Sequence, residues 1–181
     1  RMTNAEDNIL VRQALQADSE SFGRLCRRYY PALVAVADSI LLDHHLAEDA
    51  AQESLAEACR QLARLKERGR FGPWVTAICR NVAKDMLRER LRRPAPIDHD
   101  ALTAAERREE EPSELLAEAL QQLPQRLREV VFLRFYNGWS YEKMAQVLGA
   151  TPGTIDGRLR RAKKRIAVYL ARKGFRKGRI P

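Results

Sequence analysis

Two short helix patterns between positions 123 and 165 lead into a dense run of positively charged side chains. Ser140 is a good N-cap for a first helix, and Gly149 stands where a left-handed residue would end it. Thr151 and Pro152 suit the N-cap and first turn of a second helix. A tight turn between two helices, the second of them basic, is typical of the helix-turn-helix that reads the DNA major groove. The pattern predicts DNA binding.

The charge of the chain also favours a polyanionic partner. Its 181 residues carry a formal net charge of +9, and the sequence pI is about 9.9. Residues 119–181 hold fifteen basic and three acidic side chains, whereas residues 94–118 hold two basic and eight acidic ones. A basic run is by itself typical of a solvated face, but this one lies within a helix-turn-helix pattern, which favours contact with DNA.

The secondary structure of the chain is predicted to be helical throughout. Apolar residues follow the helical period, with Ile9 and Leu10 facing inward in the first helix, and no segment alternates as a strand would. Pro31 falls inside a long pattern that continues beyond it, which indicates a bend rather than an end. The predicted helices of the first half cover about residues 5–17, residues 22–42 after a cap at 18–21, residues 43–66 and residues 73–93.

The chain is expected to form two small helical domains. Pro94 and Pro96 stop the fourth helix, and the acidic segment that follows contains few large apolar residues, as in a tether. The second domain is expected to bury apolar side chains that include Leu116 and Phe135. The predicted divisions are a first domain at 1–93, an acidic flexible linker at 94–112, a helix-turn-helix domain at 113–172 and a basic tail at 173–181.

Composition argues against several other classes of protein. Cys26, Cys59 and Cys79 are widely spaced and are expected to be buried, reduced side chains rather than metal ligands. The sequence shows no phosphate-binding glycine loop, nucleophile–base pair or metal-ligand set, so we expect no catalytic residues, no metal, no cofactor and no enzyme activity. It also shows no membrane span and no signal peptide, which predicts a cytoplasmic protein.

Two further sets of residues carry a resemblance to a known family. Residues 47–53 and 71–85 resemble region 2 of bacterial RNA polymerase sigma factors of the extracytoplasmic-function class, within the sigma-70 family. Residues 123–129, 138–142 and 153–155 resemble region 4 of the same proteins. The resemblance spans nearly the whole chain and implies a factor that binds core RNA polymerase and directs it to promoters, region 2 melting the −10 element and region 4 binding the −35 element.

The segment 47–53 carries the polymerase contact that the resemblance implies. Its polar side chains share one exposed face of a helix, opposite a stripe of alanine and leucine. Charge alone would indicate a solvated edge, but the resemblance implies docking on the β′ clamp of core polymerase, with the β flap as a further contact. The expected docking residues are Glu48, Asp49, Gln52 and Glu53.

The fourth helix and the loop before it are implied to engage the melted −10 element. Cations at helical spacing can follow the phosphates of an opened strand, and aromatic surfaces can stack on its bases. Trp74 lies on the apolar stripe and is expected in the core instead. The expected −10 residues are Lys66, Arg68, Arg70, Phe71, Arg80, Asn81, Lys84 and Arg88.

The second helix of the helix-turn-helix is implied to meet the −35 element. Asp156 and Gly157 depart from the family, in which a basic residue and a serine are common there. Because an aspartate cannot bind phosphate but can accept from cytosine N4, an unusual −35 preference is predicted. The expected −35 residues are Arg134, Thr151, Thr154, Asp156, Arg158, Arg160, Arg161 and Lys164.

Two other functions remain open on sequence grounds. One is a stand-alone helix-turn-helix regulator that binds duplex DNA without polymerase. The other is an adaptor that binds an anti-sigma factor and has lost promoter recognition, which the departure at Asp156 and Gly157 would fit. The resemblance also implies an anti-sigma factor, or another regulatory protein, as a partner of this chain.

Overall fold

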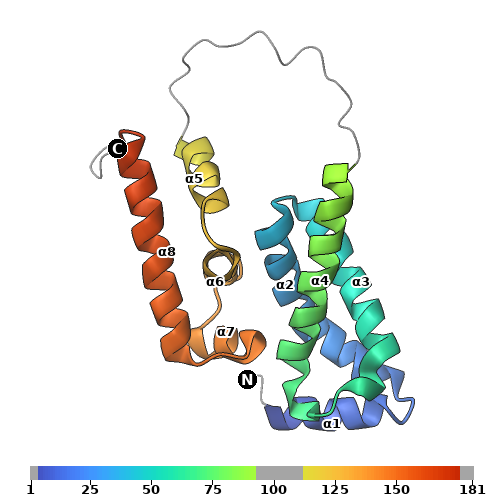
Figure 1. Ribbon diagram of the computed structural model, residues 1–181. Coiled ribbons are helices and arrows are strands. Elements are labelled where there is room, and N and C mark those ends of the chain that lie inside the picture. Colours follow the sequence, from blue (N-terminus) through green and yellow to red (C-terminus); the bar gives the residue numbers. More distant parts are fainter. Residues whose placement is uncertain (1–3, 93–111, 176–181) are drawn as a thin grey trace.

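Eight α-helices and two short 3-10 helices make up the part of the chain that this computed structural model describes, residues 4–92 and 112–175 (Figure 1). No strand occurs within those two ranges, so the all-α prediction is confirmed. The elements are α1 (Asn4–Ala14), α2 (Ser19–Leu41), α3 (His44–Gln61), η1 (Leu62–Arg64), η2 (Arg68–Arg70), α4 (Phe71–Arg92), α5 (Pro112–Gln121), α6 (Gln125–Phe135), α7 (Tyr141–Leu148) and α8 (Pro152–Arg172).

Local capping explains where the helices of the first half begin. Asp18 accepts hydrogen bonds from the backbone N–H of Glu20 and Ser21 at 3.1 and 3.3 Å, and so starts α2. The helix continues through Pro31 as predicted. Asp43 caps α3 in the same way, accepting from the N–H of Leu46 at 3.2 Å.

Helices α1 to α4 form the N-terminal bundle, in which α2 packs against α1, α3 and α4. A buried carboxylate, Asp7, holds α1 on α2 by accepting hydrogen bonds from Tyr29 Oη and from Arg28 Nη1, the latter at 2.7 Å. The predicted inward face of α1 was wrong by part of a turn, since Ile9 is exposed while Leu10 and Val11 are buried. The buried side of α1 includes the polar residue Asp7, so the apolar pattern alone did not give the correct orientation of the helix.

Several predicted helix ends also differ from the structure, among them that of the first helix, which ends at Ala14 rather than near residue 17. The third helix ends at Gln61 rather than near Lys66 and is followed by the 3-10 turn η1. The fourth begins at Phe71, two residues before Pro73, because a proline in the first turn removes only an N–H that has no partner within the helix.

Helices α5 to α8 form the C-terminal bundle, in which α8 packs against the other three. Its core includes Leu127, Leu133, Met144 and Ile155. Leu116 and Phe135 were predicted to lie in this core, but they are exposed, Phe135 by 60%. These two residues line a surface groove.

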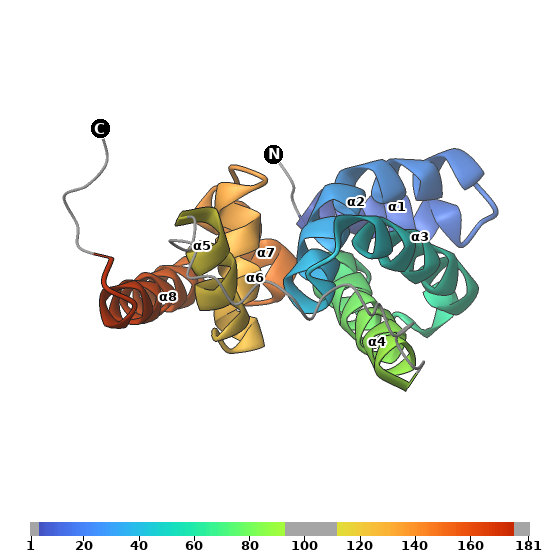
Figure 2. The same cartoon turned by 90° about the horizontal axis from the view of Figure 1, so that it is seen from above.

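The two bundles lie against each other, with α6 on α2 and α7 on α4 (Figures 1 and 2). One continuous cluster of buried apolar side chains runs through both bundles. Nearly all of the predicted acidic linker lies outside the described residues, as does the tail beyond Phe175.

Candidate nucleic-acid interface

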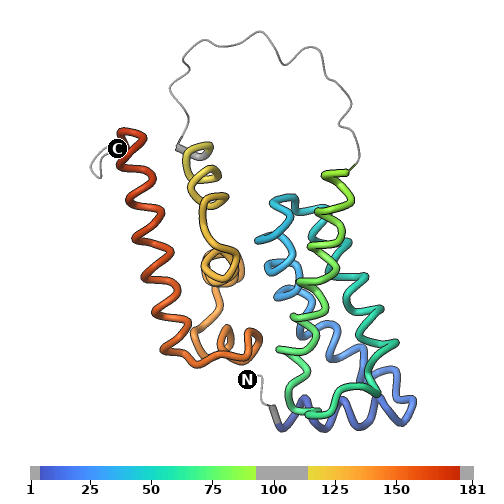
Figure 3. Tube along the Cα trace, viewed as in Figure 1, coloured from blue at the N-terminus to red at the C-terminus, as the bar shows by residue number. Residues whose placement is uncertain are grey.

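Helices α7 and α8 form the predicted helix-turn-helix, and the chain trace turns sharply between them (Figure 3). Ser140 Oγ accepts from the N–H of Lys143 at 3.3 Å, and Gly149 ends α7 in the left-handed conformation at φ 62°. Thr151 Oγ1 accepts from the N–H of Thr154 at 3.2 Å and starts α8. The three capping positions predicted from the sequence are confirmed.

The outer face of α8 carries the cations expected for DNA. Ile155, Leu159 and Ala162 are buried, so the residues between them point away from the core. Arg158 differs from its neighbours, because it is partly buried and burial lowers its pKa. The exposed members of the predicted −35 set on this helix and its cap are Thr151, Thr154, Arg160, Arg161 and Lys164.

Asp156 is engaged within α8. Its carboxylate pairs with the guanidinium of Arg160 one turn later, and Arg161 Nε donates to the carbonyl of Gly157 at 3.1 Å. An acidic group therefore stands among cations on the face predicted to read DNA, with about a third of its side chain exposed.

Arg134, at the end of α6, supports the turn that enters α7. Its Nη1 donates to the carbonyl of Trp139 at 2.8 Å, and its guanidinium lies 5.6 Å from the centre of the Tyr141 ring. Lys143 covers the Trp139 ring at 3.8 Å. Arg134 is exposed, so its guanidinium both orders the turn and remains accessible.

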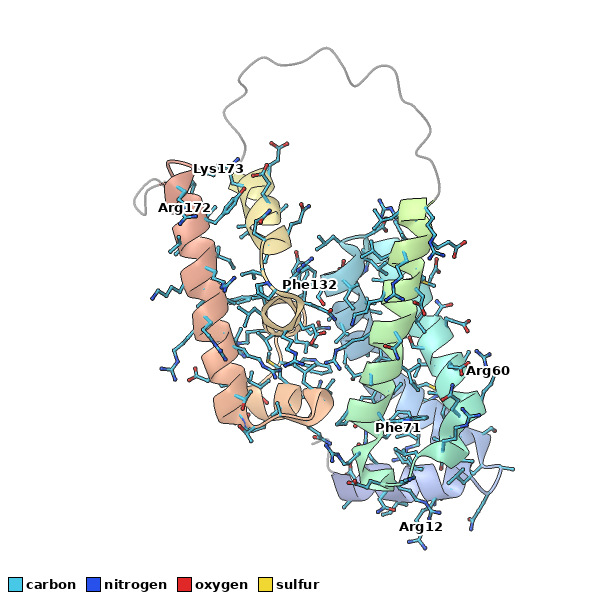
Figure 4. All side chains as sticks on the ribbon, in the orientation of Figure 1. Arg12, Arg60, Phe71, Phe132, Arg172 and Lys173 are labelled. Carbon is cyan, nitrogen blue, oxygen red and sulfur yellow. The ribbon has the colours of Figure 1, made fainter. Side chains whose placement is uncertain are left out.

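The loop before α4 is exposed and basic, as predicted for a −10 contact. Lys66, Arg68 and Arg70 are exposed, and Arg70 pairs loosely with Glu67 at 3.7 Å. Phe71 does not fit the prediction, since its ring is fully buried in the N-terminal bundle (Figure 4).

The aromatic environment of Phe71 explains its burial. The Phe71 ring lies 6.5 Å from Phe22, 5.3 Å from Tyr29 and 5.8 Å from Trp74 between ring centres. Phe71 therefore serves the core and not the DNA surface. Trp74 packs against that core as expected.

Three of the four −10 residues predicted on α4 remain available at the surface. Asn81 and Arg88 are exposed and Lys84 is partly exposed, and Arg88 pairs with Asp85 on its own helix at 2.6 Å. Arg80 is different, because its guanidinium binds a residue of the other bundle.

Arg80 and Glu129 form a two-pronged ion pair between α4 and α6. Arg80 Nε donates to Glu129 Oε1 at 2.8 Å and Nη2 donates to Oε2 at 3.1 Å. Glu129 also accepts from Gln125 Nε2 at 3.0 Å, and its side chain is only 1% exposed. Breaking such a buried pair by removing one partner costs about 3–5 kcal/mol. Glu129 was not predicted as a site residue. An acidic residue beside the apolar positions Leu127 and Val130 was the available signal of a buried, paired carboxylate.

A cavity of about 810 Å³ lies between the bundles and brings together residues of both predicted DNA sets. Arg70 comes from the −10 set, whereas Thr151, Thr154 and Arg158 come from the −35 set. A Cβ atom added to Gly149 would lie 3.2 Å from Pro73 Cβ at this junction.

The predicted polymerase-docking residues lie on α3, which packs against α2 and α4 within the N-terminal bundle (Figures 1 and 2). Asp49, Gln52 and Glu53 are exposed and Glu48 is partly exposed. Glu53 pairs with Arg60 at 2.8 Å, and Figure 4 shows Arg60 pointing outward from α3. The structure thus brings the four predicted residues onto one accessible face.

An apolar groove of about 740 Å³ on the C-terminal bundle was not foreseen. Phe135 and Tyr136 are 60% and 70% exposed at its edge, and α5 and α8 supply aliphatic walls. Exposed apolar surface of this kind is typical of a protein-binding site. Its lining consists of Leu116, Leu120, Val131, Phe135, Tyr136, Lys163, Ile166, Ala167, Leu170, Ala171 and Phe175.

The described residues contain no group of three or more His, Cys, Asp or Glu side chains placed to hold a metal ion. Burial of the cysteines was predicted for all three, but only Cys79 is buried, while Cys26 is partly exposed and Cys59 exposed. Burial raises the pKa of the Cys79 thiol to about 11. In the same ranges, no helix combines the length and apolar character that crossing a membrane requires.

Comparison with known families matches both halves of the chain. The family described as Sigma-70 region 2 matches residues 25–93, and the family described as Sigma-70, region 4 matches residues 113–166. The RNA polymerase sigma-H factor of Pseudomonas aeruginosa is 29% identical, over 91% of this chain and 94% of that protein. The ECF RNA polymerase sigma-E factor of Salmonella typhimurium is 27% identical, over 88% of this chain and 92% of that protein.

Two solved structures have similar folds. CnrH, solved in complex with the cytosolic domain of CnrY, has a TM-score of 0.60 and 26% identity, covering 92% of this chain and 98% of that one. The sigma factor RpoE of Bartonella quintana, solved with the anti-sigma factor NepR, has a TM-score of 0.53 and 28% identity, covering 84% of this chain and 98% of that one.

Proposed function

Because this chain belongs to the sigma-70 family, as an RNA polymerase sigma factor of the extracytoplasmic-function class, we propose a division of its work between the two bundles. The N-terminal bundle holds core polymerase and the −10 element, and the C-terminal bundle holds the −35 element. This proposal is supported above all by the matches to the region 2 and region 4 families, which follow in chain order over residues 25–93 and 113–166. The test is promoter-specific initiation by core polymerase supplied with this protein.

The stand-alone regulator is not favoured. A stand-alone regulator would need only the helix-turn-helix, whereas this chain also matches region 2. Relatives that align with nearly the whole chain bear the names of RNA polymerase sigma factors. We also propose that the chain is an initiation factor rather than an enzyme, and that it acts in the cytoplasm together with core polymerase.

Polymerase docking is assigned to α3 through Glu48, Asp49, Gln52 and Glu53. Their support is accessibility, since Asp49, Gln52 and Glu53 are exposed, Glu48 is partly exposed, and the main contacts between the bundles are made by α2 and α4. An acidic face of this kind suits a basic partner surface. The partner surface proposed for it is the β′ clamp.

The apolar groove around Phe135 and Tyr136 is proposed as the second polymerase contact. Its walls of leucine, isoleucine and alanine suit an amphipathic helix, and the β flap is the partner proposed for it. The anti-sigma factor bound to the RpoE relative supports the proposal that this chain also has an anti-sigma partner.

DNA contact is assigned to the exposed cations of α4, of its preceding loop and of α8. Lys66, Arg68 and Arg70 follow one another on the loop, where they can meet the phosphates of an opened strand. Thr151 and Thr154 stand at the N-terminus of α8, where the helix dipole favours a phosphate.

Asp156 is proposed to set the −35 preference, and Asp156→Arg should change it. The wild-type carboxylate can accept from cytosine N4, whereas an arginine binds guanine, so one −35 position should shift from cytosine to guanine by roughly 10-fold. The measurement is transcription from a promoter library randomised at −35. Glu114→Arg, which makes the same charge change on α5, is the control. Identical base preferences for Asp156→Arg and wild type would contradict the assignment.

A further inference from the structure

Two of the three cysteines stand at facing positions of the hairpin that α2 and α3 form. Cys26 of α2 lies sixteen positions before Leu42, and Cys59 of α3 lies sixteen positions after Asp43, where the chain turns between the two helices (Figure 1). Two helices that pack together across so short a turn run antiparallel, so residues at equal distances from the turn lie side by side. Cys26 and Cys59 are therefore neighbours across this contact.

The buried thiol of Cys79 in α4 supports the same register of α2 and α3. Its Sγ donates to the carbonyl of Leu33 in α2 at 3.4 Å, and the Ser54 side chain of α3 interacts by a hydrogen bond with the same thiol. Leu33 lies nine positions before Leu42, and Ser54 lies eleven positions after Asp43. One side chain of α4 thus meets both helices at nearly equal distances from their turn.

Small side chains let α2 and α3 approach each other closely. The buried residues of α3 are all alanine or serine: Ala47, Ala50, Ala51, Ser54 and Ala58. Helix axes lie about 8 Å apart where residues of this size meet. A disulfide joins Cα atoms that are up to about 7 Å apart. Cys59 follows Ala58 at the edge of this narrow contact, where a facing cysteine on α2 comes within that reach.

The thiols of Cys26 and Cys59 also influence each other. Burial raises the pKa of the Cys26 thiol, and the Cys59 thiol raises it further, more strongly than the adjacent Arg27 lowers it. Cys59 is exposed and Cys26 is partly exposed, whereas Cys79 is buried. A small oxidant in solution can therefore reach the facing pair but not the third cysteine.

We propose that Cys26 and Cys59 form a modification site, at which a hydroperoxide joins the two thiols in a disulfide. In a reducing compartment, disulfides are typically transient and respond to oxidants. Neither cysteine belongs to the residues assigned to polymerase or to DNA. The site is therefore an addition to the proposed function and does not depend on it.

The exposed thiol reacts first, because the raised pKa of Cys26 leaves less of its thiolate. The Cys59 thiolate attacks one oxygen of hydrogen peroxide and the O–O bond breaks, which oxidises the sulfur to a sulfenic acid. The hydroxide that leaves takes up the proton of the thiol as water. The Cys26 thiolate then attacks the same sulfur, the S–O bond breaks, and a second water leaves. Two thiols lose two electrons, and one peroxide is reduced to two waters.

The disulfide would close the α2–α3 hairpin into a covalent loop from residue 26 to residue 59. A cross-link over a loop of this length stabilises the fold, mainly by restricting the unfolded chain. It also ties the end of α3 to α2 just before η1. Oxidation should therefore raise the melting temperature of the protein by about 5 °C or more.

The test uses the reduced full-length protein, treated with hydrogen peroxide, quenched with an alkylating reagent and digested for mass spectrometry. We expect one pair of peptides joined through Cys26 and Cys59, an alkylated Cys79, and a monomer on a non-reducing gel. A reductant should restore both thiols. Thermal unfolding followed by circular dichroism should show the higher melting temperature in the oxidised protein and its loss after reduction.

Cys26→Ser and Cys59→Ser should each abolish the cross-link and the rise in melting temperature. Cys79→Ala is the matched control, because it removes one cysteine and leaves the facing pair, so both effects should remain. Circular dichroism before oxidation shows whether each variant keeps its helices. The proposal would be overturned if peroxide oxidised Cys59 while Cys26 stayed free for alkylation, or if Cys59 linked two molecules instead. An equal rise in melting temperature in Cys26→Ser would overturn it as well.

Discussion

Glu48→Lys combined with Asp49→Lys is expected to weaken the capture of core RNA polymerase by about 100-fold or more, since it sets like charges against a basic partner at several points. The fold should survive, because neither carboxylate is fully buried and the contact of Glu48 with His44 is long, at 3.8 Å. The measurement is pull-down of purified core polymerase at moderate salt.

The matched control for this charge reversal is Glu20→Lys with Glu114→Lys. Both residues are exposed, Glu20 on α2 and Glu114 on α5, and the pair makes the same change in net charge. The control should capture polymerase as the wild type does. Equal capture by the two double variants would remove α3 from the docking surface.

Gly72→Ala is expected to destabilise the N-terminal bundle by about 3 kcal/mol, because an added Cβ would lie 2.7 Å from Tyr29 Cε1. Tyr29 cannot retreat, since its hydroxyl is bound to the buried Asp7 and its ring packs on Phe71. The melting temperature should fall by roughly 10 °C or more for a domain of this size. Thermal unfolding followed by circular dichroism measures the change.

Gly157→Ala is expected to raise the melting temperature in the same assay, in contrast to Gly72→Ala. A Cβ at this position in α8 meets no atom within 4 Å, so alanine should stabilise the helix by about 0.5–1 kcal/mol. If Gly72→Ala melted at the wild-type temperature, the close packing of α4 on Tyr29 would be wrong.

Local features of the fold could be predicted because their causes lie within a few residues. Asp18, Ser140 and Thr151 bond to N–H groups two or three positions ahead, and Gly149 adopts the left-handed angle that ends α7. The apolar stripe of α8 likewise follows from its period alone.

Features that depend on distant residues could not be predicted in this way. Glu129 meets Arg80 across 49 positions of the sequence, and no local pattern links them. Phe71 lies next to a basic loop, which suggested DNA contact, yet the rings around it place it in the core. Phe135 fits the apolar period of α6, but the other helices leave that edge uncovered.

The assignment of this chain as a sigma factor is tested most directly by reconstituted transcription. Core polymerase with and without the purified protein is given a library of bacterial DNA fragments, and the transcript starts are mapped. We expect new starts that depend on the protein and share one pair of −10 and −35 sequences. No protein-dependent start, together with sequence-specific duplex binding by the protein alone, would contradict the assignment.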